Sequence, residues 1–96
     1  MKLSGKQLNY LRSLAHHRKP VIFIGTAGLS DAVMTEIEIA LSHHELVKMK
    51  TSGADKNERK MLMKAICEKT GAAAVQSIGA MLVLYRAAEK PKITLP

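Results

Sequence analysis

The sequence predicts an α/β fold, a compact two-layer sandwich of three helices on one mixed four-stranded sheet. The spacing of apolar residues changes between helical and strand periods in the order helix, strand, helix, strand, helix, strand, strand. The two strand–helix–strand units predict parallel pairs with right-handed crossovers, and the last two strands predict a hairpin with one antiparallel neighbour. A chain of 96 residues suits a single core, so we expect residues 1–96 to form one domain with a basic tail at residues 87–96.

The first helix is expected to begin after Ser4, because Ser4 and Gln7 have the spacing of a capping box. It ends before Pro20, which biases the preceding residue toward extended structure. The helix presents one apolar face, formed by Leu8, Leu11, Leu14 and Ala15.

Residues 21–24, VIFI, form an unbroken apolar run, which is typical of a strand buried on both faces. The run enters a glycine loop, Gly25, Thr26, Ala27 and Gly28, where the strand gives way to a helix. Glycine permits left-handed backbone angles and close approach of another molecule, so such a loop can direct N–H groups at a phosphate. A tight turn that needs only glycine conformations is the alternative. Asp31 would repel a phosphate on the helix axis, so a phosphate is expected on the loop itself.

Known nucleotide-binding motifs do not fit this loop. A P-loop requires a lysine after its second glycine, and Leu29 stands there. A dinucleotide fingerprint requires a third glycine where Asp31 stands, and the G-x-x-G of a KH domain joins two helices rather than a strand and a helix.

The second helix is expected over residues 30–42, followed by a strand, ELVKMK, with Lys48 and Lys50 on one face. Asp55 and Glu58 have capping-box spacing and open a third helix, which Gly71 ends. The expected inward residues of the second and third helices are Val33, Ile37, Ala40, Leu41, Met61, Leu62, Ala65 and Ile66. Residues 75–78 and 81–86 complete the chain as the hairpin.

The charge distribution predicts a polyanionic partner. The formal net charge is +7, with 15 basic and 8 acidic residues. Residues 2–19 contain basic residues and no acid, whereas residues 31–45 contain acids and no Lys or Arg, which indicates a basic face and an acidic back. A solvated surface without a partner is the alternative. Aromatic residues are too few for a base-stacking platform, so backbone and shape recognition is expected.

Topology groups the basic residues at two ends of the expected sheet. Parallel strands bring the glycine loop and Lys50 to one edge, and an antiparallel first helix would add Lys2 and Lys6 to that rim. The opposite end is expected to carry Arg18, Lys19 and Arg86. The third helix carries a further stripe whose role stays open: Lys56, Lys60 and Lys64.

Other functional classes find little support. The chain has no long apolar run and no signal peptide, so neither a membrane nor a secretory location is expected. The single Cys67 excludes an internal disulfide, and the adjacent histidine pairs lack chelating spacing. No acidic residue has an evident partner base. We therefore expect a cytoplasmic protein that is not an enzyme and has no cofactor, metal or small-molecule substrate.

Four segments together resemble the bacterial YhbY family, the free-standing form of the chloroplast RNA splicing and ribosome maturation (CRM) domain: KPVIFIGTAGLSDAV, ALSHHELVKMK, GAAAVQSIGAMLVLYR and KITLP. The resemblance implies an RNA-binding fold similar to the C-terminal domain of translation initiation factor 3, and association with large-subunit precursors. Gly25 to Gly28 match the family's RNA-contact loop, and the basic residues of the first helix with Arg18 and Lys19 match its basic surface. Because Thr26 and Ala27 are uncharged, affinity is expected to come from neighbouring basic residues.

The expected function is non-enzymatic binding of ribosomal RNA in large-subunit precursors during ribosome assembly. The alternative is a protein-docking module that joins ribosomal particles through its acidic side; DNA binding is disfavoured because no helix–turn–helix is visible. The expected RNA-binding residues are Lys2, Lys6, Arg12, Arg18, Lys19, Gly25, Thr26, Ala27, Gly28, Lys48, Lys50 and Arg86.

Overall fold

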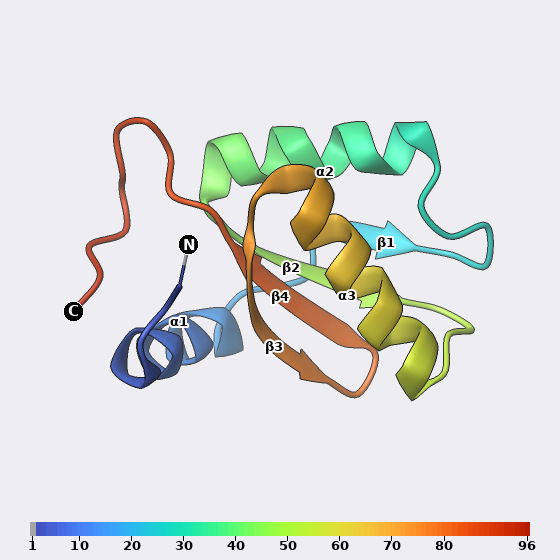
Figure 1. The fold of residues 1–96 in the computed structure, drawn as a ribbon, viewed down its shortest axis with the longest axis horizontal. Helices are drawn as coiled ribbons and strands as arrows, with labels where there is room; N and C mark the ends of the chain where they lie inside the picture. Colours follow the sequence, from blue (N-terminus) through green and yellow to red (C-terminus); the bar gives the residue numbers. More distant parts are fainter. Residues whose placement is uncertain (1) are drawn as a thin grey trace.

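Helices and strands follow one another in the predicted order (Figure 1). The computed structural model describes residues 2–96. Its elements are α1 (Gly5–His16), β1 (Ile22–Ile24), α2 (Asp31–His44), β2 (Leu46–Thr51), α3 (Lys56–Thr70), β3 (Ala73–Ile78) and β4 (Met81–Tyr85).

Local signals define the helix ends as the sequence predicts. Ser4 Oγ accepts a hydrogen bond from the Gln7 N–H at 3.1 Å, and Gln7 Oε1 accepts one from the Ser4 N–H at 3.0 Å. Asp55 and Glu58 form the same reciprocal arrangement at the start of α3. Gly71 ends α3 in the left-handed conformation, with φ of 74°. Both capping boxes and the glycine cap are therefore confirmed.

The strand order is β1-β2-β4-β3, and within residues 2–96 only β1 and β2 form a parallel pair. β4 lies between β2 and β3 and is antiparallel to both, so the expected second parallel pair does not form. The composition of β4 explains its central place: Leu82 to Tyr85 are all buried, which suits a strand covered on both faces.

Helices cover both faces of the sheet, so the fold has three layers rather than the expected two (Figure 1). Leu82 and Leu84 of β4 face a core shared with α2 and α3. Val83 and Tyr85 alternate with them and face a second core with α1 and the C-terminal tail. The α/β class, the three helices and the mixed four-stranded sheet are confirmed.

Two burial predictions are wrong. β1 is an edge strand, and Val21 and Phe23 are 52% and 65% exposed because α1 packs over the other strands on that face. Met61 is 72% exposed, since α3 turns Met63 and Ile66 inward instead.

Candidate nucleic-acid interface

The glycine loop closes as a tight turn. The Gly28 N–H donates to the Gly25 carbonyl oxygen at 3.0 Å, and Gly28 has φ of +73°. Ser30 then caps α2 by accepting a hydrogen bond from the Val33 N–H. The backbone N–H groups of Thr26 and Ala27 donate no hydrogen bond to any residue in 2–96, and both residues are exposed. The loop therefore keeps two backbone donors available to an anion.

A second loop, residues 52–54, supports the glycine loop. The Ser52 N–H donates to the Ile24 carbonyl oxygen at 2.9 Å, at the carboxyl ends of the parallel strands. A Cβ on Gly53 would lie 3.0 Å from Thr26 Cγ2, so the two loops touch. Between the loops and α3 lies a hollow of about 390 Å³, lined by Gly25, Thr26, Gly28, Ser52, Gly53, Ala54, Glu58, Met61, Leu62 and Ala65.

Basic side chains extend from this loop along β2 to the end of α1. Lys50 is exposed and pairs in register with Phe23. Lys48, two residues earlier on the same face, donates from Nζ to the carbonyl oxygens of Ala15 at 3.3 Å and Arg18 at 3.2 Å. These bonds join β2 to the carboxyl end of α1, where cations are favourable. We call Lys50, Lys48, Arg18 and Lys19 the basic strip.

The basic strip ends at a second hollow, of about 450 Å³. Arg18, Lys19 and Lys48 line it, together with Lys92 of the tail and the histidine pair His43 and His44. The sequence interpretation missed Lys92 and the histidines as candidates. For Lys92 the signal was the basic composition of the tail, which carries Lys90 and Lys92. The position of the tail beside this hollow depends on the packing of Ile93 against the α1 core, which the sequence does not reveal.

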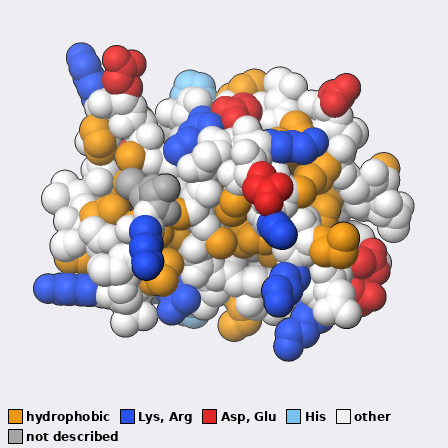
Figure 2. Space-filling model, in the orientation of Figure 1, with side chains coloured by type: hydrophobic (Ala, Val, Ile, Leu, Met, Phe, Trp, Pro, Cys, Tyr) orange, Lys and Arg blue, Asp and Glu red, His pale blue; other side chains and the backbone are white. Residues whose placement is uncertain are grey.

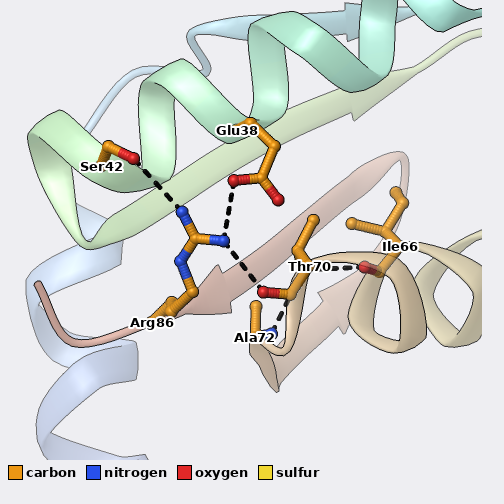
Figure 3. Close-up of polar contacts among 6 residues, drawn as sticks. All are labelled: Glu38, Ser42, Ile66, Thr70, Ala72 and Arg86. Carbon is orange, nitrogen blue, oxygen red and sulfur yellow. Dashed lines mark hydrogen bonds and ion pairs between the residues drawn. The ribbon is translucent and has the colours of Figure 1, made fainter.

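Arg86 belongs to a structural network rather than to this surface (Figure 3). Its guanidinium donates to Glu38 Oε2 and to the Thr70 carbonyl oxygen, both at 2.9 Å, and to Ser42 Oγ at 3.3 Å. It thereby joins β4 to α2 and α3. Arg86 and Arg18 lie at the same end of the sheet, as expected, but Arg86 contacts the helices on one face and Arg18 lies on the opposite face. We leave Arg86 out of the candidate interface.

The expected rim of Lys2, Lys6, Lys50 and the glycines does not form. The start of α1 and the glycine loop lie at opposite ends of the long axis (Figure 1). Lys2 lines a hollow with Lys64 and residues 72–74 instead. The cause is that α1 packs across β2, β4 and β3 and not along β1. Arg12 Nε correspondingly donates to the Val75 carbonyl oxygen of β3 at 3.1 Å.

The lysine stripe of α3 does not extend the basic strip. Lys56, Lys60 and Lys64 are exposed, but Asp55 and Glu58 stand among them. Figure 2 shows positive and negative side chains mixed over α3. This face therefore offers a matched control for charge substitutions on the basic strip.

Residues 2–96 contain no group of three or more His, Cys, Asp or Glu side chains placed to hold a metal ion. Burial raises the pKa of Cys67, which keeps its thiol protonated. In the part of the chain described, no helix is long and apolar enough to cross a membrane.

Replacing Gly28 by alanine tests the loop conformation. A left-handed residue with a Cβ is strained, so Gly28→Ala is expected to lower the free energy of unfolding by about 1–2 kcal/mol. Urea denaturation measures this value. Gly5→Ala is the control, because Gly5 opens α1 without positive φ and a Cβ there meets nothing within 4 Å. Equal stability of Gly28→Ala and wild type would contradict the turn geometry.

Comparison with known proteins finds relatives over almost the whole chain. The family model for the CRS1/YhbY (CRM) domain matches residues 3–86. A Haemophilus influenzae protein named "RNA-binding protein" is 51% identical over 94 residues, covering 98% of this chain and 95% of that protein. A Pseudomonas aeruginosa protein named as a probable RNA-binding protein is 38% identical, with coverage of 99% and 91%. The solution structure of a Staphylococcus aureus protein described as a candidate RNA-binding protein superposes with a TM-score of 0.86 at 38% identity, covering 99% of this chain and 100% of that one. The chain belongs to the CRS1/YhbY (CRM) domain family.

Proposed function

We propose that the protein binds RNA without catalysing a reaction, and that its target is ribosomal RNA in large-subunit precursors during ribosome assembly. The observation that carries the proposal is the continuity of the glycine loop with the basic strip. Backbone donors at Thr26 and Ala27, which have no partner within residues 2–96, lead into Lys50, Lys48 and Arg18 on one side of the sheet. The names of the relatives support RNA as the polyanion. For this role we propose the cytoplasm as the location of the protein.

The interface is expected to recognise backbone geometry first. Lysine and arginine neutralise phosphates and release counterions, which makes affinity fall steeply with salt. Backbone N–H groups of the loop contact phosphate oxygens and fix the position of the RNA. The strip follows β2 from the glycine loop to the end of α1, so it suits a backbone that runs along the strand.

Sedimentation of cell lysate through a sucrose gradient tests the target. Wild-type protein is expected to travel with large-subunit precursors and to return to the top after ribonuclease treatment. Lys19→Glu/Lys50→Glu is expected to remain at the top, because two exposed cations of the strip are reversed. The control Lys56→Glu/Lys60→Glu makes the same change of charge on α3 and is expected to travel like wild type. Absence of wild-type protein from the precursor fractions would contradict the proposed target.

The alternative is docking on a ribosomal protein through the acidic side of α2. Glu36 is exposed and suits a test, whereas Glu38 pairs with Arg86 at 2.9 Å, so its reversal would disturb the fold. Suppose that the Glu36→Lys variant no longer sedimented with the large-subunit precursors, whereas the Lys19→Glu/Lys50→Glu variant still did. Protein docking would then replace RNA binding as the function.

A further inference from the structure

A row of exposed and half-buried side chains crosses the open end of the sheet. Phe23 pairs in register with Lys50, Lys50 with Met81, and Met81 with Ile78. Register partners in a sheet project from the same face and lie close together. Phe23 is 65% and Ile78 is 61% exposed, and Lys50 between them is also exposed. The row therefore combines an aromatic ring, a cation and aliphatic side chains on one surface.

The row stays uncovered because α1 stops short of it. On this face α1 packs over Leu46, Val83 and Tyr85, toward the other end of the sheet. Lys48 donates to the carbonyl oxygen of Ala15, in the last turn of α1, and to that of Arg18, just after the helix, and so marks where the helix ends. The next residue on this face of β2 is Lys50, which lies beyond the helix. Exposed large apolar side chains grouped on one face of a small domain are a feature that indicates a partner.

Lysine within the patch indicates the chemistry of that partner. The cores of protein–protein interfaces are depleted in lysine, whereas a nucleotide presents a flat base and a phosphate side by side. Phe23 also lies two residues before Gly25, so the row begins next to the glycine loop along the chain. Both observations favour a nucleotide over a protein or a second copy of the chain.

We propose that this row is a stacking site for an unpaired nucleotide, whose base lies on the Phe23 ring while its phosphate contacts Lys50. The proposal rests on the proposed RNA binding and deepens it, because it adds a base contact to a backbone grip. It also revises the expectation from composition that aromatic residues are too few for stacking. One exposed ring is sufficient for one base, and such stacking accepts any base because every base has a π face. The site would favour RNA with an unpaired nucleotide beside a helix.

Fluorescence anisotropy with two RNA probes tests the site. One probe is a blunt labelled hairpin, and the other is the same hairpin with a single-stranded oligoadenylate tail. Phe23→Ala is expected to weaken binding of the tailed probe about 5- to 50-fold, and to leave the blunt hairpin unchanged. Phe23→Tyr keeps the ring and is expected to bind like wild type. Ile39→Ala, which shortens an exposed apolar side chain of α2 outside the row, is the matched control.

Two further readings separate stacking from other causes. The salt dependence of binding is expected to be the same for Phe23→Ala and wild type, because no phosphate contact is removed, whereas Lys50→Ala lowers the slope by about one. Replacing the oligoadenylate tail of the probe by abasic nucleotides is expected to lower the affinity of wild type to that of Phe23→Ala. The same replacement is expected to leave the affinity of Phe23→Ala unchanged.

The outcomes distinguish the two proposals. If wild type binds both probes and Phe23→Ala binds the tailed probe with the same affinity as wild type, the proposed stacking site is wrong, but the proposal of RNA binding is retained. If wild type binds neither probe at ~100 mM salt, RNA binding itself is contradicted and the stacking site with it. If Phe23→Ala instead abolishes self-association in analytical ultracentrifugation and leaves RNA binding intact, the occupant is a second copy.

Discussion

Reversing two cations of the basic strip is expected to weaken RNA binding by the purified protein by about 100-fold at ~0.1 M salt. Each phosphate contact multiplies the binding constant by a factor that varies roughly with the inverse of the salt concentration. Loss of one contact therefore lowers the affinity about tenfold at this salt concentration. Lys19 and Lys50 are exposed, and neither side chain donates a hydrogen bond to residues 2–96, so Lys19→Glu/Lys50→Glu changes charge without disturbing the fold. Titration of a labelled hairpin RNA over a range of salt concentrations measures both the affinity and its slope, which is expected to fall by about two.

The control for this prediction is Lys56→Glu/Lys60→Glu, which lowers the net charge by the same amount. Its affinity is expected to stay within a few-fold of wild type, because long-range effects are screened over about 10 Å at this salt. Equal losses in both double variants would mean that the protein attracts RNA only through its net charge of +7. Such a result would remove the basic strip as a specific interface.

Lys48 is left out of this experiment on purpose. Its Nζ binds the carbonyl oxygens of Ala15 and Arg18, so substitution would loosen the end of α1 as well as remove a charge. A loss of affinity in a Lys48 variant would therefore combine two causes. Arg86 presents the same difficulty, because three acceptors hold its guanidinium.

Local signals in the sequence predicted the elements well. Ser4 with Gln7 and Asp55 with Glu58 specify their helix starts through side chains only three residues apart, so no distant contact is needed. The exposure of Phe23 could not be predicted in this way. Four consecutive apolar residues give no alternation, and which face of β1 is covered depends on where α1 packs, a contact between segments far apart in the chain.

The candidate site was predicted in part for the same reason. The glycine loop and Lys50 follow from the parallel pairing of β1 with β2, which a strand–helix–strand unit implies. Lys2 and Lys6 were placed wrongly because the packing of Leu11 and Ala15 directs α1 across the sheet. The groups that accept hydrogen bonds from Arg86 come from α2 and the end of α3. They lie close to Arg86 because β4 is placed between β2 and β3, which the sequence did not predict.

The C-terminal tail is held by one buried carboxylate, that of Glu45. Glu45 is fully buried at the end of α2 and has φ of 61°. Its Oε2 accepts a hydrogen bond from the Ala88 N–H at 2.8 Å, and its Oε1 accepts from the N–H groups of Lys92 at 2.8 Å and Ile93 at 2.9 Å. The tail then packs Ile93 against the α1 core.

The protonation state of Glu45 links this anchor to pH. Burial by itself raises the pKa of Glu45, but the three backbone N–H donors and the Lys92 charge outweigh burial and hold the pKa below its ordinary value of 4.5. A carboxyl group with a lowered folded-state pKa stabilises the fold above the unfolded value. This contribution is fully present above about pH 5 and is lost as the pH falls through the folded-state pKa.

Glu45→Ala is therefore expected to release the tail and to lower the free energy of unfolding by about 3 kcal/mol. Hydrogen bonds to a charged acceptor contribute about 1.5–3 kcal/mol each, and hydration of the freed N–H groups offsets part of that loss. Hydrogen exchange is expected to lose protection at Ala88, Lys92 and Ile93, and urea denaturation gives the change in stability. Glu45→Gln keeps one acceptor oxygen, so its free energy of unfolding is expected to lie between those of wild type and Glu45→Ala.

The same substitution is expected to reach the RNA interface, because the tail carries Lys92 into the hollow beside Arg18 and Lys19. Release of the tail removes that cation, so affinity for the hairpin RNA falls by up to about tenfold, the value of one phosphate contact. Lys92→Ala is the control, since it removes the charge and leaves the anchoring N–H in place. If Glu45→Ala left both the exchange of Ile93 and the stability unchanged, the carboxylate would not hold the tail. If only RNA affinity were unchanged, Lys92 would lie outside the interface, and the interface would not extend past the basic strip into the tail.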